Sequence, residues 1–351
     1  MENKKVLQDY NMEEIKELMK KYSVPAFRAK QLFEGMICYK PIQDMQSLPK
    51  DLKDKLDEEY SSQPVLIHKK YVSKDGTIKY LFSLSDNNLI EGVFMKYSYG
   101  NTLCISTQVG CRMGCSFCAS TLDGLVRNLS AGEMLGEVLA VNKDNLGDKT
   151  NRKVTNIVLM GSGEPLDNYD NTIKFLRNVS SPDGLCVSPR NISLSTCGLL
   201  NKISMLKNEH LDITLTISLH SAIDEKRRKM MKVSNGYTLA ELIEVLRDYQ
   251  KENKRRIVFE YILTRDNTSE ADVLALKNLT KGLLCHINLI PLNDTENVIK
   301  NSITRGMAER FLEKLIDNGL SATIRRTLGE DIEGACGQLK RRYLSQVTDN
   351  D

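Results

Sequence analysis

The segment TLCISTQVGCRMGCSFCAS, residues 102–120, joins the pattern of a β-strand to a loop that holds three of the nine cysteines of the chain. Residues 102–108 are rich in the apolar and β-branched residues that favour a strand. Residues 130–143 follow with a helical period, and Ser130 and Glu133 are placed as a capping box at its start. A strand, a cysteine-bearing loop and a helix therefore follow one another, which indicates the first unit of an α/β protein.

The same order of strand and helix recurs as far as residue 327. Short apolar runs that favour strands alternate with segments of helical period, at 154–161, 171–179, 191–198, 199–208, 215–220, 238–253, 256–263, 269–283, 286–292, 306–319 and 321–327. Repeated strand–helix units predict a parallel sheet with its helices outside. Six such units are too few for a closed eightfold barrel, so we expect a partial (β/α)6 barrel.

The residues before this series have a different pattern. It predicts three helices and then a β-meander of three strands, over 11–22, 25–37, 47–60, 65–73, 77–84 and 89–96. We therefore expect an N-terminal accessory domain at 1–97, a barrel at 98–300 and a C-terminal extension at 301–351. No apolar run reaches the roughly 20 residues that a membrane span needs, and the first residues lack the apolar core of a signal peptide.

Composition and charge restrict the classes of function. The chain of 351 residues has a net charge of +3, so affinity for nucleic acid must come from local basic runs. Such runs occur at 224–232, 251–256 and 339–342, although a basic run is more often a solvated face. Nine unevenly spaced cysteines do not form the even pattern of a disulfide framework. We expect a cytoplasmic protein whose thiols serve a metal or a reaction.

Cys111, Cys115 and Cys118 have the spacing Cys-x3-Cys-x2-Cys, directly after the strand at 102–108. The working residues of parallel (β/α) barrels lie beyond the carboxyl ends of the strands, so we expect this loop on the functional face. A structural zinc ion normally takes four ligands, which would require Cys104 or a histidine as the fourth. A [4Fe–4S] cluster held by three thiolates leaves one iron open to a substrate. The spacing alone leaves three interpretations possible: a zinc site, an iron–sulfur cluster and unligated thiols. It favours the cluster.

The cysteine motif, with Phe117 before its last cysteine, resembles the signature of radical S-adenosylmethionine enzymes. In that superfamily the open iron binds the amino and carboxylate groups of S-adenosylmethionine, and partial (β/α) barrels are the usual fold. Further stretches are similar, in the same order, to the RlmN-type adenine C2 methyltransferases, whose near relatives are the Cfr-type C8 enzymes: TLCISTQVGC, LMGSGEPLDN, LSTCG, SLH, INLIPLN and GEDIEGACGQL. Pro165 in GEPL resembles the C2 enzymes more than the C8 enzymes.

The resemblance implies a radical methyltransferase that acts on adenine C2 of 23S rRNA and tRNA and consumes two molecules of S-adenosylmethionine per methyl group. Cys336 matches the position that first carries the methyl group as S-methylcysteine. Cys104 matches the cysteine that later forms a transient disulfide with it, and Glu91 aligns with the proton acceptor. The cluster ligands are then Cys111, Cys115 and Cys118. The residues expected to contact S-adenosylmethionine are Gly163, Glu164, Ser195, Ser218, Leu219, His220 and Asn293.

The implied partners are 23S rRNA, tRNA and an electron donor such as flavodoxin or ferredoxin, and we expect a monomer with no membrane contact. Arg28, Lys30 and the basic runs at 226–232 and 339–342 are candidates for phosphate contacts. The chain departs from the family pattern by GSG before Glu164, by STCG at residues 195–198 and by the absence of tryptophan. We expect structural roles for the remaining cysteines, Cys38, Cys186, Cys197 and Cys285, of which Cys197 lies close to the expected cofactor and keeps an open role. A non-catalytic, metal-stabilised RNA-binding protein is the rival hypothesis from a different class.

Overall fold

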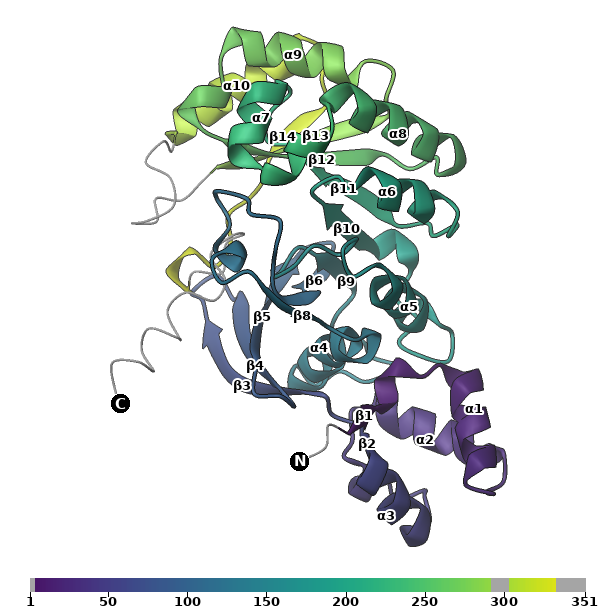
Figure 1. The fold of residues 1–351 in the computed structure, drawn as a ribbon. Helices are drawn as coiled ribbons and strands as arrows, with labels where there is room; N and C mark the ends of the chain where they lie inside the picture. Colours follow the sequence, from purple (N-terminus) through teal and green to yellow (C-terminus); the bar gives the residue numbers. More distant parts are fainter. Residues whose placement is uncertain (1–3, 292–302, 333–351) are drawn as a thin grey trace.

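The computed structural model describes residues 4–291 and 303–332. One sheet of ten strands dominates it, in the order β14-β13-β12-β11-β10-β9-β6-β5-β4-β3 (Figure 1). Every neighbouring pair from β6 to β14 is parallel. These strands are β6 (Gly100–Cys104), β9 (Asn156–Leu159), β10 (Ile192–Thr196), β11 (Thr214–Ser218), β12 (Ile257–Leu263), β13 (Cys285–Pro291) and β14 (Ala322–Ile324).

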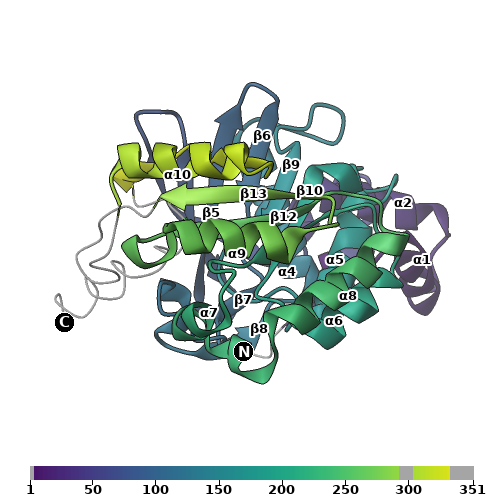
Figure 2. The same ribbon diagram turned by 90° about the horizontal axis from the view of Figure 1, so that it is seen from above.

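At least one helix lies between each two consecutive parallel strands, and the helices flank the sheet on its outer side (Figures 1 and 2). They are α4 (Ala131–Asp144), α5 (Tyr169–Ser180), α6 (Leu200–Lys207), α8 (Leu239–Glu252), α9 (Glu270–Thr280) and α10 (Arg305–Asp317). The short helix α7 (Asp224–Met230) precedes α8 and ends beside the cysteine loop, where the N–H of Ser116 donates to the carbonyl of Met230 at 2.9 Å. The capping box that the sequence predicts at Ser130 forms, because its hydroxyl accepts from the backbone N–H of Glu133. The order of strands and helices confirms the expected partial (β/α) barrel.

The β-meander continues the barrel sheet across residue 97. Strands β3 (Val65–Val72), β4 (Ile78–Leu84) and β5 (Leu89–Tyr97) pair antiparallel with one another, and β5 pairs antiparallel with β6. The division into domains at residues 97 and 98 therefore stays a prediction, since hydrogen bonds of one sheet cross it.

The N-terminal helices α1 (Met12–Lys21), α2 (Phe27–Ile37) and α3 (Lys50–Glu59) lie at the opposite end of the molecule from α9 and α10 (Figure 1). The short strands β1 (Lys5–Val6) and β2 (Tyr60–Ser61) pair beside them. One apolar cluster of buried side chains extends from Leu7 through the barrel to Ala322. The Asp9 carboxylate also accepts from the N–H of Gly132 at 2.6 Å, so the first residues are fixed to the start of α4.

The cysteine loop differs in detail from the sequence expectation. The strand predicted over 102–108 ends at Cys104, and residues Gln108–Gly110 form a separate strand, β7, that pairs with β8 (Leu125–Asn128). The bend arises because the backbone N–H groups of Thr107 and Gln108 both donate to the carbonyl of Ser162 in the β9–α5 loop. No helix in the described part of the chain is long and apolar enough to span a membrane.

Candidate active site

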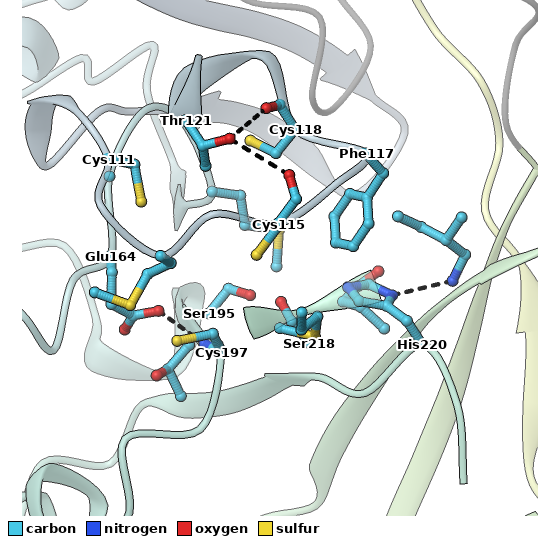
Figure 3. A pocket seen from close by; sticks show the side chains of 18 of the residues that line it. Cys111, Cys115, Phe117, Cys118, Thr121, Glu164, Ser195, Cys197, Ser218 and His220 are labelled. Carbon is cyan, nitrogen blue, oxygen red and sulfur yellow. Dashed lines mark hydrogen bonds between the residues drawn. The ribbon is translucent and has the colours of Figure 1, made fainter. Parts of the chain in front are cut away.

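A cavity of about 150 Å³ lies where the carboxyl ends of the parallel strands meet the cysteine loop. Its wall contains the three motif cysteines and residues that follow β9, β10 and β11 (Figure 3). This is the position at which parallel barrels bind their ligands, because the loops after all strands converge there. The expected site residues that line it are Cys111, Cys115, Cys118, Gly163, Glu164, Ser195, Ser218 and His220.

Backbone hydrogen bonds fix the shape of the cysteine loop. The N–H of Cys111 donates to the carbonyl of Gly124 at 2.9 Å, and the N–H of Cys118 donates to the carbonyl of Cys115 at 3.1 Å. The hydroxyl of Thr121 donates to the carbonyls of Cys118 and Cys115 at 3.0 and 3.4 Å (Figure 3). Gly110 has φ of +76°, and a Cβ there would overlap the carbonyl oxygen of Gly124. The loop can therefore close only with glycine at this position.

Burial is the main influence on the thiols of this loop. It raises the pKa of Cys111 and of Cys115 to about 12, and the neighbouring cysteines add to the effect. Both thiols are therefore neutral unless a cation is bound, and metal binding must release their protons. Three soft sulfur donors on one rim are the ligands that iron–sulfur clusters take.

Zinc sites and iron–sulfur clusters space their protein ligands differently. In the described residues, no three His, Cys, Asp or Glu side chains converge closely enough to hold one metal ion. A structural zinc site requires such convergence around a single ion. A [4Fe–4S] cluster instead takes one thiolate on each of three irons, so its ligands stand farther apart. Three cysteines around one cavity match the ligand number of a cluster that keeps one iron open.

Glu164 lies on the opposite wall and is buried, with 4% of its surface exposed. Its carboxylate accepts from the N–H of Cys197 at 2.7 Å and from the N–H of Leu166 at 3.0 Å. Burial raises the pKa of this carboxyl group, while the two N–H donors oppose the effect. Gly163 has φ of +110°, and a Cβ there would lie 2.7 Å from the side chains of Thr107 and Gln108. Glycine at this position thus lets the backbone pack closely on the segment of Thr107 and Gln108, next to a carboxylate acceptor suited to an ammonium group.

His220, directly after β11, is a neutral donor on the same rim. Its Nδ1 accepts from the backbone N–H of Ile262 at 3.2 Å, so the ring proton of the neutral side chain is on Nε2. The Nε2 side of the ring faces Ser218, and Phe117 of the cysteine motif packs edge-on against the ring, with centroids 4.6 Å apart (Figure 3). Burial, and secondarily the charge of Arg227, lower the pKa of His220 to about 3.

The low pKa of His220 predicts a stability that falls as the pH falls below about 6.5. In the unfolded chain this side chain takes up a proton near its ordinary pKa of roughly 6.5, whereas the folded state binds it only near pH 3. The unfolded state therefore gains protons first, and the free energy of unfolding should fall by about 1 kcal/mol between about pH 7.5 and about pH 5.5. Urea unfolding at the two pH values measures this difference in the free energy of unfolding.

The matched variants for this measurement are His220→Asn and His210→Asn. Both histidines have positive φ, a conformation that asparagine tolerates, and His210 is exposed. The His220 variant should lose most of the pH dependence, and the His210 variant should keep it. An equal slope in both variants would assign the pH dependence to other groups.

The other expected site residues that the structure describes lie outside the cavity wall. Leu219 is fully buried in the main apolar core. Cys104 is 5% exposed and packs in a separate cluster with Val93 and Met95. The carboxylate of Glu91 forms a buried ion pair with Lys79, at 3.1 Å, in the antiparallel part of the sheet. Asn293 and Cys336 lie outside the described residues.

Four residues with ionisable side chains line or support the cavity without a site role expected from the sequence. Cys197, expected to be structural, lines it, and the side chains of Glu260 and Arg325 also contribute to its wall. Arg227, expected on an exposed basic run, is 1% exposed and lies behind the wall. The unusual STCG stretch marks Cys197. The basic run predicts an exposed Arg227, and Glu260 and Arg325 occupy ordinary strand patterns that carry no functional signal.

A partial (β/α) barrel with a Cys-x3-Cys-x2-Cys loop above its strand ends defines a radical S-adenosylmethionine enzyme. Accordingly, the profile of the Radical SAM superfamily matches residues 105–277. Such an enzyme uses a [4Fe–4S] cluster and S-adenosylmethionine, and the three cysteines, Glu164 and the adjoining rim provide ligands of the kinds both require.

Whole-chain comparisons identify the family within this class. The chain is 48% identical over 343 residues to a probable dual-specificity RNA methyltransferase RlmN of Clostridium novyi, covering 96% of this chain and 98% of the relative. A protein with the same description from Alkaliphilus metalliredigens is 48% identical over 336 residues, covering 95% and 94%. The crystal structure of a radical SAM methyltransferase from Sphaerobacter thermophilus is similar with a TM-score of 0.91 at 38% identity, covering 96% and 99%. This chain belongs to the RlmN family of RNA methyltransferases.

Proposed function

We propose that this enzyme methylates adenine C2 in 23S rRNA and in tRNA by way of a methyl group carried on Cys336. Adenine C2 lies between two ring nitrogens and is electron-poor, so it cannot attack the methyl group of a sulfonium as a nucleophile. When bound, the cluster and S-adenosylmethionine supply a carbon-centred radical, which can react at such a carbon through the methyl group on the protein. The remaining chemistry belongs to the protein side chains.

The packing around Cys104 is the observation that carries this proposal. Leu328, near the end of the described chain, packs against the cluster that contains Cys104 and Met160. Met160 also lines the cavity beneath the cysteine loop. Cys336 follows Leu328 by eight residues, so the chain that carries it starts beside Cys104. An extended chain of that length spans at most about 28 Å, which keeps the two cysteines within reach of each other.

The chain before Cys336 is also held firmly by the β3–β4 turn. The Asp331 carboxylate accepts from the hydroxyl of Ser73 at 2.5 Å and from the N–H of Lys74 at 3.1 Å. The N–H of Gly329 donates to the carboxylate of Asp75 at 2.9 Å. These bonds lower the pKa of Asp331, and those on Asp75 outweigh its burial and lower its pKa to about 2. The anchor supports a role in which the following residues present Cys336 to the site.

We assign proton removal from adenine C2 to Glu91. It lies on β5 two residues from Val93, and side chains two apart in a strand point to the same face of the sheet. Val93 is opposite Cys104 in the β5–β6 ladder and packs against it. The Lys79 ammonium, 3.1 Å away, stabilises the ionised form of the carboxylate that a base requires. Glu91 and Cys104 are thus on one face of one sheet.

RNA binding is proposed for the outer face of α2. Arg28 stacks on the ring of the exposed Phe27, with its guanidinium 4.7 Å from the ring centroid, and Lys30 is exposed beside it. A basic group next to an exposed ring can bind a phosphate and stack on a base. The run at 226–232 is less suited to RNA than expected, because Arg227 is buried and Lys226 pairs with Asp272 at 2.7 Å.

The finer partner assignments belong to the same proposal. We propose that the enzyme acts as a monomer in the cytoplasm and receives electrons from a flavodoxin or a ferredoxin. Size-exclusion chromatography with light scattering measures the oligomeric state. Methylation with each reduced donor in place of dithionite tests the electron source.

Intact-protein mass measurement tests the carrier role of Cys336. Wild-type protein treated with S-adenosylmethionine, without RNA, should gain one methyl group, and peptide mapping should place it on Cys336. Cys336→Ala should gain no methyl group and should methylate no RNA, because no sulfur remains to carry the methyl group. It should keep the visible absorbance of the cluster, since its ligands are other residues.

The control is Cys38→Ala, because Cys38 is exposed at the end of α2 and far from the barrel cavity in sequence. It should behave as wild type. Methylation of RNA by Cys336→Ala at the wild-type rate would reject the carrier role. Chromatography of the modified adenosine identifies the carbon, and 8-methyladenosine would assign the chain to the Cfr-like reaction instead.

A further inference from the structure

Arg227, in α7, is among the most deeply buried large side chains of the structure, with 1% of its surface exposed. Its Nη2 donates to the carbonyl of Cys197 at 2.8 Å and to the hydroxyl of Tyr237 at 3.1 Å. Its Nε donates to the carbonyl of Leu219 at 3.2 Å. The guanidinium also faces the ring of Tyr237, 5.3 Å from its centroid. The charge is therefore held in one place behind the wall that Cys197 forms.

No carboxylate in the described part of the chain forms an ion pair with this guanidinium. Its Nη1 is buried and has no hydrogen-bond partner there. The partly buried Arg127 shows the usual arrangement instead, because it pairs with Asp86 at 2.5 Å and with Glu133 at 2.8 Å. A buried ion normally costs several kcal/mol of desolvation unless an opposite charge compensates for it. No anion among the described residues therefore compensates the charge of Arg227, which an anion bound nearby would stabilise.

The hydrogen bonds of Arg227 do not explain its presence. The carbonyl of Cys197 also accepts from the hydroxyl of Tyr237 at 2.8 Å, and the carbonyl of Leu219 also accepts from the N–H of Ser221 at 2.8 Å. Both acceptors would keep a donor without the guanidinium. An apolar side chain of similar length would fill the same space at lower desolvation cost.

The place nearest to Arg227 at which negatively charged groups would bind is the candidate active site. Cys197 and Ser218, whose carbonyls it contacts, both line the cavity. The core of an oxidised [4Fe–4S] cluster is a dication, so three thiolates leave the cluster with one net negative charge, and reduction adds a second.

We propose that Arg227 is a positioning residue whose fixed positive charge raises the reduction potential of the cluster bound by the motif cysteines. The charge favours the reduced, more negative state over the oxidised state, so less driving force is needed to add the electron. Arg227 touches neither substrate nor the reacting atoms. The proposal rests on the cluster of this enzyme class and is independent of which RNA is methylated.

Potentiometric titration of the anaerobically reconstituted full-length protein tests the proposal, with electron paramagnetic resonance as the readout. Arg227→Gln should lower the midpoint potential, so that the ratio of reduced to oxidised cluster at a fixed potential falls about tenfold, or about 59 mV for one electron. Arg227→Lys should restore most of the potential. Arg228→Gln is the matched control on the same helix, because Arg228 lies 3.9 Å from Asp224 with 42% of its side chain exposed.

An unchanged midpoint in Arg227→Gln, with full iron and sulfide content, would overturn the proposal. If this variant binds no cluster, urea unfolding of the iron-free proteins decides whether Arg227 has a purely structural role. Arg227→Met should then be at least as stable as iron-free wild type, because the unpaired charge is gone, and a large loss of stability would show a purely structural role. No RNA enters either measurement, so failure of the methylation reaction would not affect them.

Discussion

Replacement of Cys115 with alanine is expected to abolish cluster binding and, with it, all reductive cleavage of S-adenosylmethionine. The loop offers three thiolates for a cluster of four irons, so the loss of one leaves two irons without a protein ligand. Mutation of a residue that only hydrogen-bonds to a metal ligand typically lowers metal affinity or activity 10- to about 100-fold. Loss of a ligand itself should lower both further. Iron and sulfide content and the release of 5′-deoxyadenosine with dithionite measure the effect.

The matched control for Cys115→Ala is Cys186→Ala. Cys186 is exposed in the segment between α5 and β10, and it is not part of the cavity wall. This variant should keep full iron content and full cleavage. If Cys115→Ala kept a cluster that cleaves S-adenosylmethionine, the assignment of the three ligands would be wrong. Replacement of iron by one zinc ion in the wild-type protein would favour the rival, non-catalytic hypothesis.

Replacement of Cys104 with alanine is expected to trap a covalent complex between the protein and RNA. Once the methylene group on Cys336 has joined adenine C2, the base stays attached through the sulfur. By the proposed mechanism, the Cys104 thiolate would attack that sulfur, the S–S bond would form as the S–C bond breaks, and the released carbon would take up a proton to become the methyl group. An external thiol then reduces the disulfide. Without Cys104 the S–C bond persists.

A denaturing gel should show Cys104→Ala shifted by the mass of the RNA, with at most one adduct per protein. Cys104 is buried beside Val93, so alanine occupies the site without a new polar group. Cys285→Ala is the control, because Cys285 is a partly buried cysteine at the start of β13, away from the cavity wall. Continued multiple turnover by Cys104→Ala, without a shifted band, would reject the resolving role.

Local sequence signals predicted most elements of the fold because their causes are local. Asn11, Ser130 and Thr238 each accept from the N–H three residues later, and each begins a helix where the sequence predicts one. Strand β12 and helix α8 follow from apolar runs and helical period. The positions of the motif cysteines after β6 follow from the order of elements, since a parallel strand delivers its next loop to the same rim.

Long-range contacts decided what the sequence left open. The strand predicted through residue 108 stops early because Thr107 and Gln108 bond to Ser162, more than fifty residues away. A basic run on a short helix predicts an exposed face, yet packing of α7 against the carbonyls of Cys197 and Leu219 buries Arg227. Neither outcome has a signal within its own segment.

The chain alone determined the order of strands and helices, the cysteine spacing and, through family resemblance, the reaction class. Those properties depend on backbone propensity, capping and motif chemistry among near neighbours in sequence. The tertiary structure alone decided which charges are buried, such as the ion pair of Glu91 and Lys79. It also decided which residues share the cavity wall, such as Glu164 and Cys197. Burial and electrostatic coupling arise when distant segments exclude water from one another, and no single segment encodes that.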